Sequence, residues 1–139
     1  MGLDISTAFD RIRWDFVISV LKKLDFPENW INLISQCIST VQYSVLINGR
    51  TTKVFRLCYG LTQGDPLSPI LFSICIEALS TSLTLNMGNG NIKAVSIAKN
   101  SPPLSHLLFA DDNFFFLHLN SKSLNSFSSI LSDYYTDSG

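Results

Sequence analysis

The chain has 139 residues, 46% of them hydrophobic and only 15% charged, so it is long enough to bury the core of one ordinary domain. Ten basic residues against eleven acidic ones give a net charge of −1, which argues against a free-standing nucleic-acid binder but not against a catalytic module whose basic walls lie on other domains. The three cysteines lack metal-ligand spacing and lie in apolar contexts, which favours reduced core thiols in an intracellular protein; they are Cys37, Cys58 and Cys75. No signal peptide and no transmembrane span is predicted, because the most apolar run, 70–79, is too short and carries Glu77.

The N-terminal part of the chain predicts a short strand followed by two helices. Residues 3–5 form an apolar segment that carries Asp4, and an acid at the end of an apolar strand needs a partner or an ion. Apolar spacing predicts a helix from about residue 12 to 24, with Asp10 as its N-cap or first-turn acid. A second helix is predicted to begin at Pro27. Its expected buried stripe is Trp30, Ile31, Ile34, Cys37 and Ile38.

A β-hairpin is predicted next, because Asn48-Gly49 separates two strand-like runs, 43–47 and 51–57. Its second strand carries three cations that could contact a phosphate backbone: Arg50, Lys53 and Arg56. An alternative explains these cations about equally well: exposed charges on an edge strand prevent it from pairing with another chain.

A loop rich in glycine and proline, 60–69, leads into an apolar helix predicted from 70 to about 83. Asp65 can cap this helix with Pro66 at its first position. The glycines on either side of Gln63 allow the backbone to approach a ligand, and a helix N-terminus offers donors to a phosphate.

Two apolar, aromatic-rich runs flank Asp111 and Asp112 and predict two buried strands of a covered sheet, with both acids at the hairpin tip. Neighbouring side chains of a straight strand point to opposite faces, so both acids can serve one site only if the chain turns between the runs. An Asx-rich turn without further role is the alternative. His106 and His118, on either side, have no companion at metal-ligand spacing and are predicted to be structural.

A strand at 92–98 is predicted to precede this hairpin, and a helix is predicted to follow residue 117. The inward stripe of that helix is expected to be Leu124, Phe127, Ile130 or Leu131, and Tyr134.

Three motifs therefore follow one another: a strand-borne acid before Ala-Phe-Asp, a Gln-Gly-Asp-Pro-Leu-Ser-Pro loop before an apolar helix, and a Phe-Ala-Asp-Asp hairpin. Together they resemble the palm of reverse transcriptases, most closely those of non-long-terminal-repeat (LINE-like) retrotransposons. The resemblance implies an α+β polymerase palm, in which an antiparallel sheet carries the acids and helices pack on its other face. Residues 1–139 would then be a partial reverse transcriptase domain, the palm core, with fingers and thumb missing or incomplete. Because both ends lie close to predicted elements, we expect the chain to be a piece of a larger protein.

The resemblance also implies a function, RNA-directed DNA polymerisation. Asp4 and Asp111 match the two metal-binding catalytic acids of the family, and Asp112 matches a neighbouring acid that is usually needed but is less directly a ligand. Two Mg²⁺ ions, with Mn²⁺ as an alternative, would lie roughly 3.5–4 Å apart and serve nucleotidyl transfer from a dNTP to a primer 3′-hydroxyl. The implied partners are an RNA template, a DNA primer, dNTPs and the remaining domains of a parent polyprotein, with no membrane. The implied location is intracellular, in the nucleus, the cytoplasm or both.

Three further residues take nucleotide-binding roles from the resemblance. Phe9 falls where the family places the aromatic that excludes the ribose 2′-hydroxyl, and Gln63 and Gly64 would lie against the nascent base pair and the nucleotide. The sequence departs from the family pattern mostly through the loss of basic residues near phosphates, which would weaken substrate binding. The departures are Gly2, Thr7, Tyr59, Thr62 and Asn113.

Three other interpretations compete with an active polymerase. A catalytically inactive remnant or structural palm module of a retroelement would keep the same acids. A two-metal nuclease would need a third metal-binding acid, for which Glu77 is the candidate, and would leave the Gln-Gly-Asp-Pro loop without a role. A phosphate-accepting signalling domain has its acid pair early and its lone acid late, the reverse of the order here.

Overall fold

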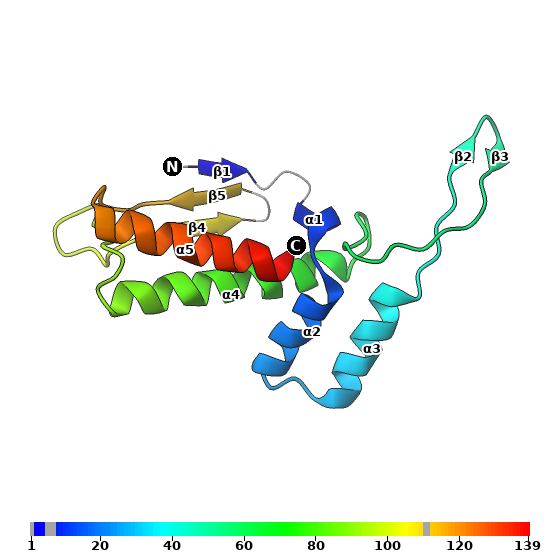
Figure 1. The fold of residues 1–139 in the computed structure, drawn as a ribbon, viewed down its shortest axis with the longest axis horizontal. Coiled ribbons are helices and arrows are strands. Elements are labelled where there is room, and N and C mark those ends of the chain that lie inside the picture. The colour runs from blue at the N-terminus through cyan, green and yellow to red at the C-terminus, as the bar shows by residue number, and fades with distance from the viewer. Residues whose placement is uncertain (1, 5–7, 110–111) are drawn as a thin grey trace.

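The computed structural model describes residues 2–4, 8–109 and 112–139, and these form an α+β arrangement of helices with small antiparallel sheets (Figure 1). The elements in chain order are β1 (Gly2–Asp4), α1 (Ala8–Arg11), α2 (Trp14–Lys23), α3 (Glu28–Ser39), β2 (Leu46–Ile47), β3 (Arg50–Thr51), α4 (Ser68–Gly88), β4 (His106–Phe109), β5 (Asp112–Phe115) and α5 (Ser121–Ser138).

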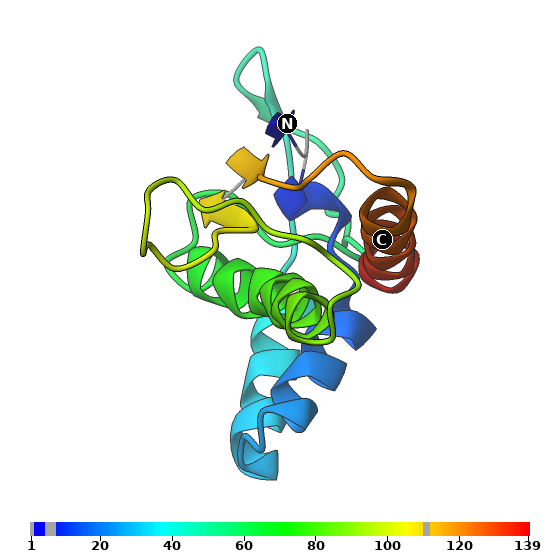
Figure 2. The ribbon, with the colours of Figure 1, turned by 90° about the vertical axis from the view of Figure 1, so that its left-hand side faces the viewer.

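The larger sheet has the strand order β1–β5–β4, and both pairings are antiparallel. Helices α4 and α5 lie along one face of it (Figures 1 and 2). Burial alternates along β5, since Asn113 and Phe115 are 1% and 4% exposed while their neighbour Phe114 is 49% exposed. The prediction of helices on one face is therefore confirmed, whereas the prediction of two buried strands is wrong. Leu107 and Phe109 are 52% and 79% exposed, because among the described residues no element covers this second face.

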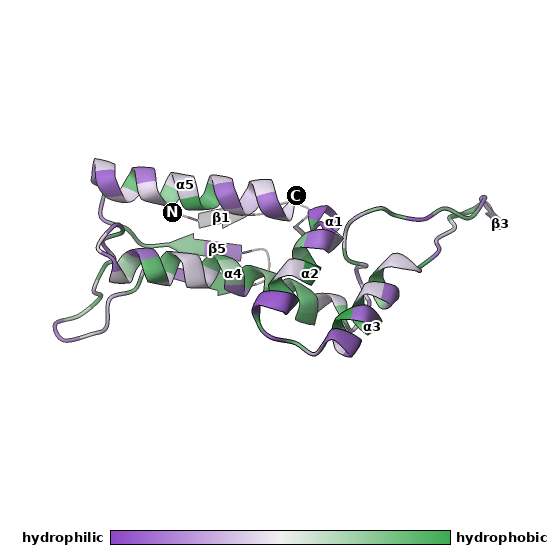
Figure 3. Ribbon diagram, turned by 60° about the horizontal axis from the view of Figure 1, so that its bottom comes forward, coloured by the Kyte–Doolittle hydropathy of each residue, from purple (hydrophilic) through white to green (hydrophobic). Residues whose placement is uncertain are grey.

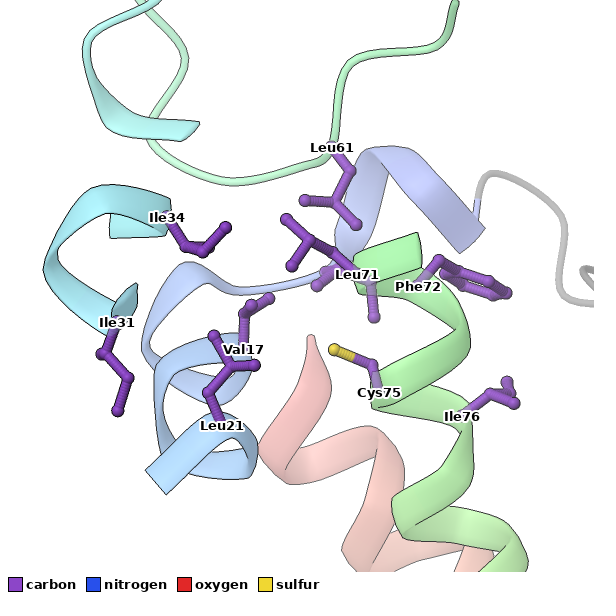
Figure 4. Close-up of a cluster of buried hydrophobic side chains, with 10 residues drawn as sticks. Val17, Leu21, Ile31, Ile34, Leu61, Leu71, Phe72, Cys75 and Ile76 are labelled. Atoms are coloured by element: carbon purple, nitrogen blue, oxygen red, sulfur yellow. The ribbon is translucent and has the colours of Figure 1, made fainter. Parts of the chain in front are cut away.

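Two clusters of buried apolar side chains form the core. The first lies where α2, α3, the N-terminal half of α4 and the loop before α4 meet (Figure 4). The second lies between α4, α5 and β5, where the rings of Phe115 and Phe127 pack edge to face with centroids 4.8 Å apart. The members of the second cluster are Leu79, Leu83, Ile92, Phe115, Phe127 and Tyr134.

Helix α4 belongs to both clusters and is apolar along most of its length, whereas α5 alternates between hydrophilic and hydrophobic residues (Figure 3). By length and composition alone α4 could cross a membrane. In this fold it packs against α2, α5 and β4, which is the surrounding expected of a central helix that is hydrophobic on several sides.

Both predicted N-terminal helices form, but their details differ from expectation. Asp10 does not cap α2, because residues 8–11 form a separate helical turn and Arg13 takes the N-cap position. Helix α3 begins directly after Pro27, as predicted. Only a narrow stripe of α3 is buried, because among the described elements its main neighbour is α2. Trp30 is therefore 54% exposed, and Cys37 is exposed as well.

The predicted Asn-Gly hairpin is confirmed, with Asn48 and Gly49 at φ of 49° and 77°, although its paired strands are shorter than expected. Helix α4 starts at Ser68 rather than at Pro66, and the Asp65 carboxylate accepts a hydrogen bond from the Leu67 backbone N–H at 2.9 Å within the preceding turn. The predicted strand at 92–98 does not form. Only isolated bridges occur there, Ala94 with Leu117 and Val95 with Leu104.

Candidate active site at the acidic end of the sheet

The acidic end of the sheet brings the start of the chain next to the β4–β5 hairpin. The antiparallel register sets Asp4 directly opposite Asp112, and Asp112 opposite Phe109. Opposed Cα atoms of such a ladder lie about 4.5–5.5 Å apart. Asp112 is exposed and pairs as the first residue of β5, so it does not lie at the hairpin tip as predicted. Asp111 lies outside the described residues.

Phe9 is held by the helix that follows β1. Its ring stacks on the ring of Phe72, with centroids 4.6 Å apart and planes 19° apart. Phe72 is 2% exposed at the start of α4, whereas Phe9 is only half-buried. One face of the Phe9 ring is therefore fixed against the core.

The loop before α4 is bound to α1 through its backbone. The Leu61 N–H donates to the Phe9 carbonyl oxygen at 2.7 Å, and the Gly60 N–H donates to the Ile12 carbonyl oxygen at 2.8 Å. The Trp14 indole Nε1–H donates to the Gly60 carbonyl oxygen at 2.7 Å. These three bonds place the motif that contains Phe9 beside the loop that contains Gln63.

Gln63 and Gly64 stand at the exposed part of this loop. The Gln63 side-chain Nε2 donates to the Asp10 carboxylate at a long 3.4 Å, so the amide is tied to α1 only weakly. Gly64 has a φ of +88°, and a Cβ placed on it would meet nothing within 4 Å. The backbone here is therefore open to close approach from solvent. Sequence reasoning missed the residues that hold the loop, Gly60 and Trp14, because a hydrogen bond between distant segments leaves no local pattern.

The donor types at the acidic end suit a hard cation. Among the residues that the structure describes, no group of three or more His, Cys, Asp or Glu side chains gathers as a metal site. The residues that meet at the end of the sheet, Asp4 and Asp112, are carboxylates, and carboxylate oxygens are the ligands that Mg²⁺ prefers.

His106 lies on the helix-covered face of β4. Its Nε2 is 3.0 Å from the Ser80 hydroxyl and its Nδ1 is 2.8 Å from the Ser105 hydroxyl. Partial burial lowers the pKa of the imidazole below its usual range, and the Glu77 carboxylate acts in the opposite direction. The prediction that His106 is structural is therefore confirmed.

Comparison with known proteins agrees with this picture. Residues 1–139 match the family described as reverse transcriptase (RNA-dependent DNA polymerase). The chain belongs to this family. The R2 Pol polyproteins among its relatives place it with the reverse transcriptases of non-long-terminal-repeat retrotransposons, which confirms the resemblance noted in its motifs.

Three relatives illustrate the range of similarity. An uncharacterized mitochondrial protein of Arabidopsis thaliana is 43% identical over 67 residues, which are 48% of this chain and 55% of that protein. The Pol polyprotein from a type-1 retrotransposable element R2 of Popillia japonica is 31% identical over 113 residues, 81% of this chain and 18% of the polyprotein. The Pol polyprotein from the type-2 element R2DM of Drosophila melanogaster is 29% identical over 87 residues, 63% of this chain and 8% of the polyprotein. The chain thus spans about half of the first relative and less than a fifth of the other two.

Proposed function

We propose that residues 1–139 form the palm core of an RNA-directed DNA polymerase within a larger retrotransposon polyprotein. The observation that carries the proposal is the register that sets Asp4 against Asp112, the residue that follows Asp111 in the sequence. The site would use an RNA template, a DNA primer and dNTPs, and the polyprotein would supply the fingers, the thumb and most of the basic contacts. It would act inside the cell, in the nucleus, the cytoplasm or both.

In this proposal Asp4 and Asp111 hold two Mg²⁺ ions, and Asp112 supports them from the neighbouring position. The ions supply charge neutralisation at the α-phosphate and the leaving oxygens, and Mn²⁺ is an alternative. Asp4 and Asp112 belong to two paired strands of one sheet, so the ladder between β1 and β5 would fix the spacing of their backbones before substrate binds. Such preorganisation is the main contribution that a protein can make to phosphoryl transfer.

The neighbouring residues position the nucleotide. Phe9, fixed on one side by Phe72, presents a rigid ring edge that would collide with a ribose 2′-hydroxyl and so select deoxynucleotides. Gln63 and the open backbone at Gly64 would lie against the nascent base pair and the incoming nucleotide. The hydrogen bonds that join α1 to the loop keep these two parts at a constant separation.

A two-metal nuclease is less well supported. Its third acid would be Glu77, which is exposed on α4 and exerts its charge on His106. His106 faces the covered side of the sheet, at the end of β4 opposite to Phe109, which pairs with Asp112. Glu77 also lines a pocket with residues of α2 and α5, among them Lys23 and Asp133, rather than with residues of β1 or β5.

The test is primer extension on an RNA template by a polypeptide that contains this domain. Replacing Asp4→Asn or Asp111→Asn should lower the extension rate at least about 100-fold. Each change removes a carboxylate that would hold a Mg²⁺ ion, and the charge of that ion would stabilise the transition state by several kcal/mol. Glu77→Gln removes an exposed carboxylate elsewhere and should leave the rate within a factor of about two. Circular dichroism and thermal unfolding should show the same fold for all three variants.

Two results would count against the proposal. Extension by the Asp4→Asn variant at the unsubstituted rate would remove Asp4 from the metal site. Failure of the unsubstituted protein to extend a bound primer with either Mg²⁺ or Mn²⁺ would favour the catalytically inactive palm module instead.

A further inference from the structure

A two-stranded arm, residues 43–57, projects away from the helices and the larger sheet (Figure 1). It contains Arg50, Lys53 and Arg56 and no acidic residue, and all three cations are exposed. The rest of the chain has seven basic residues against eleven acidic ones, so the arm carries +3 while the remainder carries −4. The positive charge is therefore concentrated on one projecting element.

Aromatic rings accompany these cations. The rings of Tyr43 and Phe55 stack across the base of the arm, with centroids 5.9 Å apart and planes 26° apart. Phe55 is nevertheless 44% exposed, and Tyr59, just beyond the arm, is 58% exposed. Exposed rings between cations are the combination by which proteins hold single-stranded nucleic acid, because bases stack on the rings while phosphates contact the cations.

The arm is also continuous with the candidate active site. Its second strand runs directly into the loop that carries Gln63, and the Tyr43 hydroxyl is hydrogen-bonded to the hydroxyl of Thr62 in that loop. A strand bound along the arm would consequently reach the place where a nucleotide is proposed to bind.

We propose that the arm binds the backbone of single-stranded nucleic acid, namely the unpaired template before it is copied. This inference rests on the proposed function, which makes nucleic acid the substrate. A protein partner is the alternative, since Leu46 and Ile47 near the tip are 68% and 57% exposed. The charge favours nucleic acid, because three cations with no acid among them on one arm complement the continuous negative charge of a phosphate backbone.

The test measures binding without catalysis. A fluorescently labelled, mixed-sequence single-stranded RNA is titrated with the domain-containing polypeptide in EDTA, at several KCl concentrations, and binding is read by fluorescence anisotropy. The triple variant Arg50→Gln, Lys53→Gln, Arg56→Gln should reduce the slope of log K against log[KCl] by about 2, since each lost single-strand phosphate contact removes roughly 0.7. At moderate salt the affinity should fall at least about tenfold.

The matched control removes three exposed lysines from other parts of the chain: Lys22→Gln, Lys23→Gln and Lys99→Gln. It makes the same change in net charge and should leave the slope nearly unchanged. Each single arm variant should reduce the slope by roughly 0.7, so the inference remains testable if the triple variant folds poorly.

Three results would overturn the inference: an unchanged slope in the arm variants, an equal loss in the control variant, or an arm protected from hydrogen exchange by the rest of the polyprotein before RNA is added. The last would identify a protein-docking element. Because the assay contains EDTA, its outcome does not depend on metal binding by Asp4 and Asp111. A failed polymerase assay and a failed arm assay can therefore be told apart.

Discussion

Gly60 sets the distance between α1 and the loop before α4. Its φ is +90°, and a Cβ built on it would lie 2.8 Å from the backbone oxygen of Asp10, closer than real Cβ contacts come. Its N–H donates a hydrogen bond to the Ile12 carbonyl oxygen, and its own carbonyl oxygen accepts one from the Trp14 indole N–H. Only a residue without a side chain permits this backbone contact.

Gly60→Ala should therefore destabilise the fold more than Gly64→Ala in the same loop. Both changes force a side chain into the left-handed region, at a cost of about 1–3 kcal/mol. Only Gly60→Ala also brings the new Cβ into a clash with the Asp10 backbone, because a Cβ on Gly64 meets nothing within 4 Å. Urea denaturation followed by circular dichroism compares the two free energies of unfolding. Equal values for the two variants would mean that the loop does not lie this close to α1.

The order of the motifs predicted which segments meet better than single residues predicted their local structural roles. The pairing of an early acid with the acidic hairpin follows from motif order, and the register at Asp4 and Asp112 agrees with it. The predictions that Asp10 and Asp65 cap helices were wrong, because an acid near the start of a helix can equally well form a hydrogen bond within a neighbouring turn or with another segment. Asp65 bonds the Leu67 N–H, and Asp10 accepts from Gln63.

Helix α4 is the element that joins the two halves of the core. Leu71 and Cys75 pack in the first cluster, and Leu79 and Leu83 pack in the second. The helix also supplies Phe72, on which Phe9 stacks. Its stability consequently controls the position of Phe9, which is proposed to contact the nucleotide, as well as the fold.

We expect Leu83→Ala to lower the free energy of unfolding by about 2–5 kcal/mol, because Leu83 is 0% exposed and its removal leaves a cavity. Leu85→Ala on the same helix should change it by less than about 0.5 kcal/mol, since Leu85 is 62% exposed. Chemical denaturation of the two variants measures the difference. Similar losses at both positions would show that α4 is buried on another face.

The sequence did not predict how much of each helix or strand is buried. Helical spacing predicted the stripe of α3, yet Trp30 is exposed because a helix at the edge of the core buries only a narrow stripe. Aromatic strands predicted a covered sheet, yet Phe109 is 79% exposed because, in the part of the chain that the structure describes, helices cover one face only. Periodicity identifies an element, whereas the number of its neighbours is a property of the whole fold.

At the scale of the whole molecule, the three cysteines lie in two kinds of environment. Cys37 on α3 and Cys58 after the arm are exposed, so the prediction of three core thiols is correct only for Cys75. Cys75 is 0% exposed in the first cluster, and burial raises the pKa of its thiol to about 12. The Tyr134 hydroxyl of α5 donates to the Cys75 carbonyl oxygen at 3.4 Å, so α4 and α5 must separate before this site opens.

Thiol reactivity should therefore measure opening of the core. The thiolate is the reactive form, so at pH 8 a disulfide reagent such as DTNB should modify Cys37 and Cys58 rapidly and Cys75 only when the chain unfolds. The double variant Cys37→Ser, Cys58→Ser leaves Cys75 as the single thiol. Its modification rate in increasing urea should rise in parallel with the unfolded fraction seen by circular dichroism. Rapid modification of Cys75 in native buffer would contradict the packing of α4 against α2 and α5, and with it the support beneath Phe9.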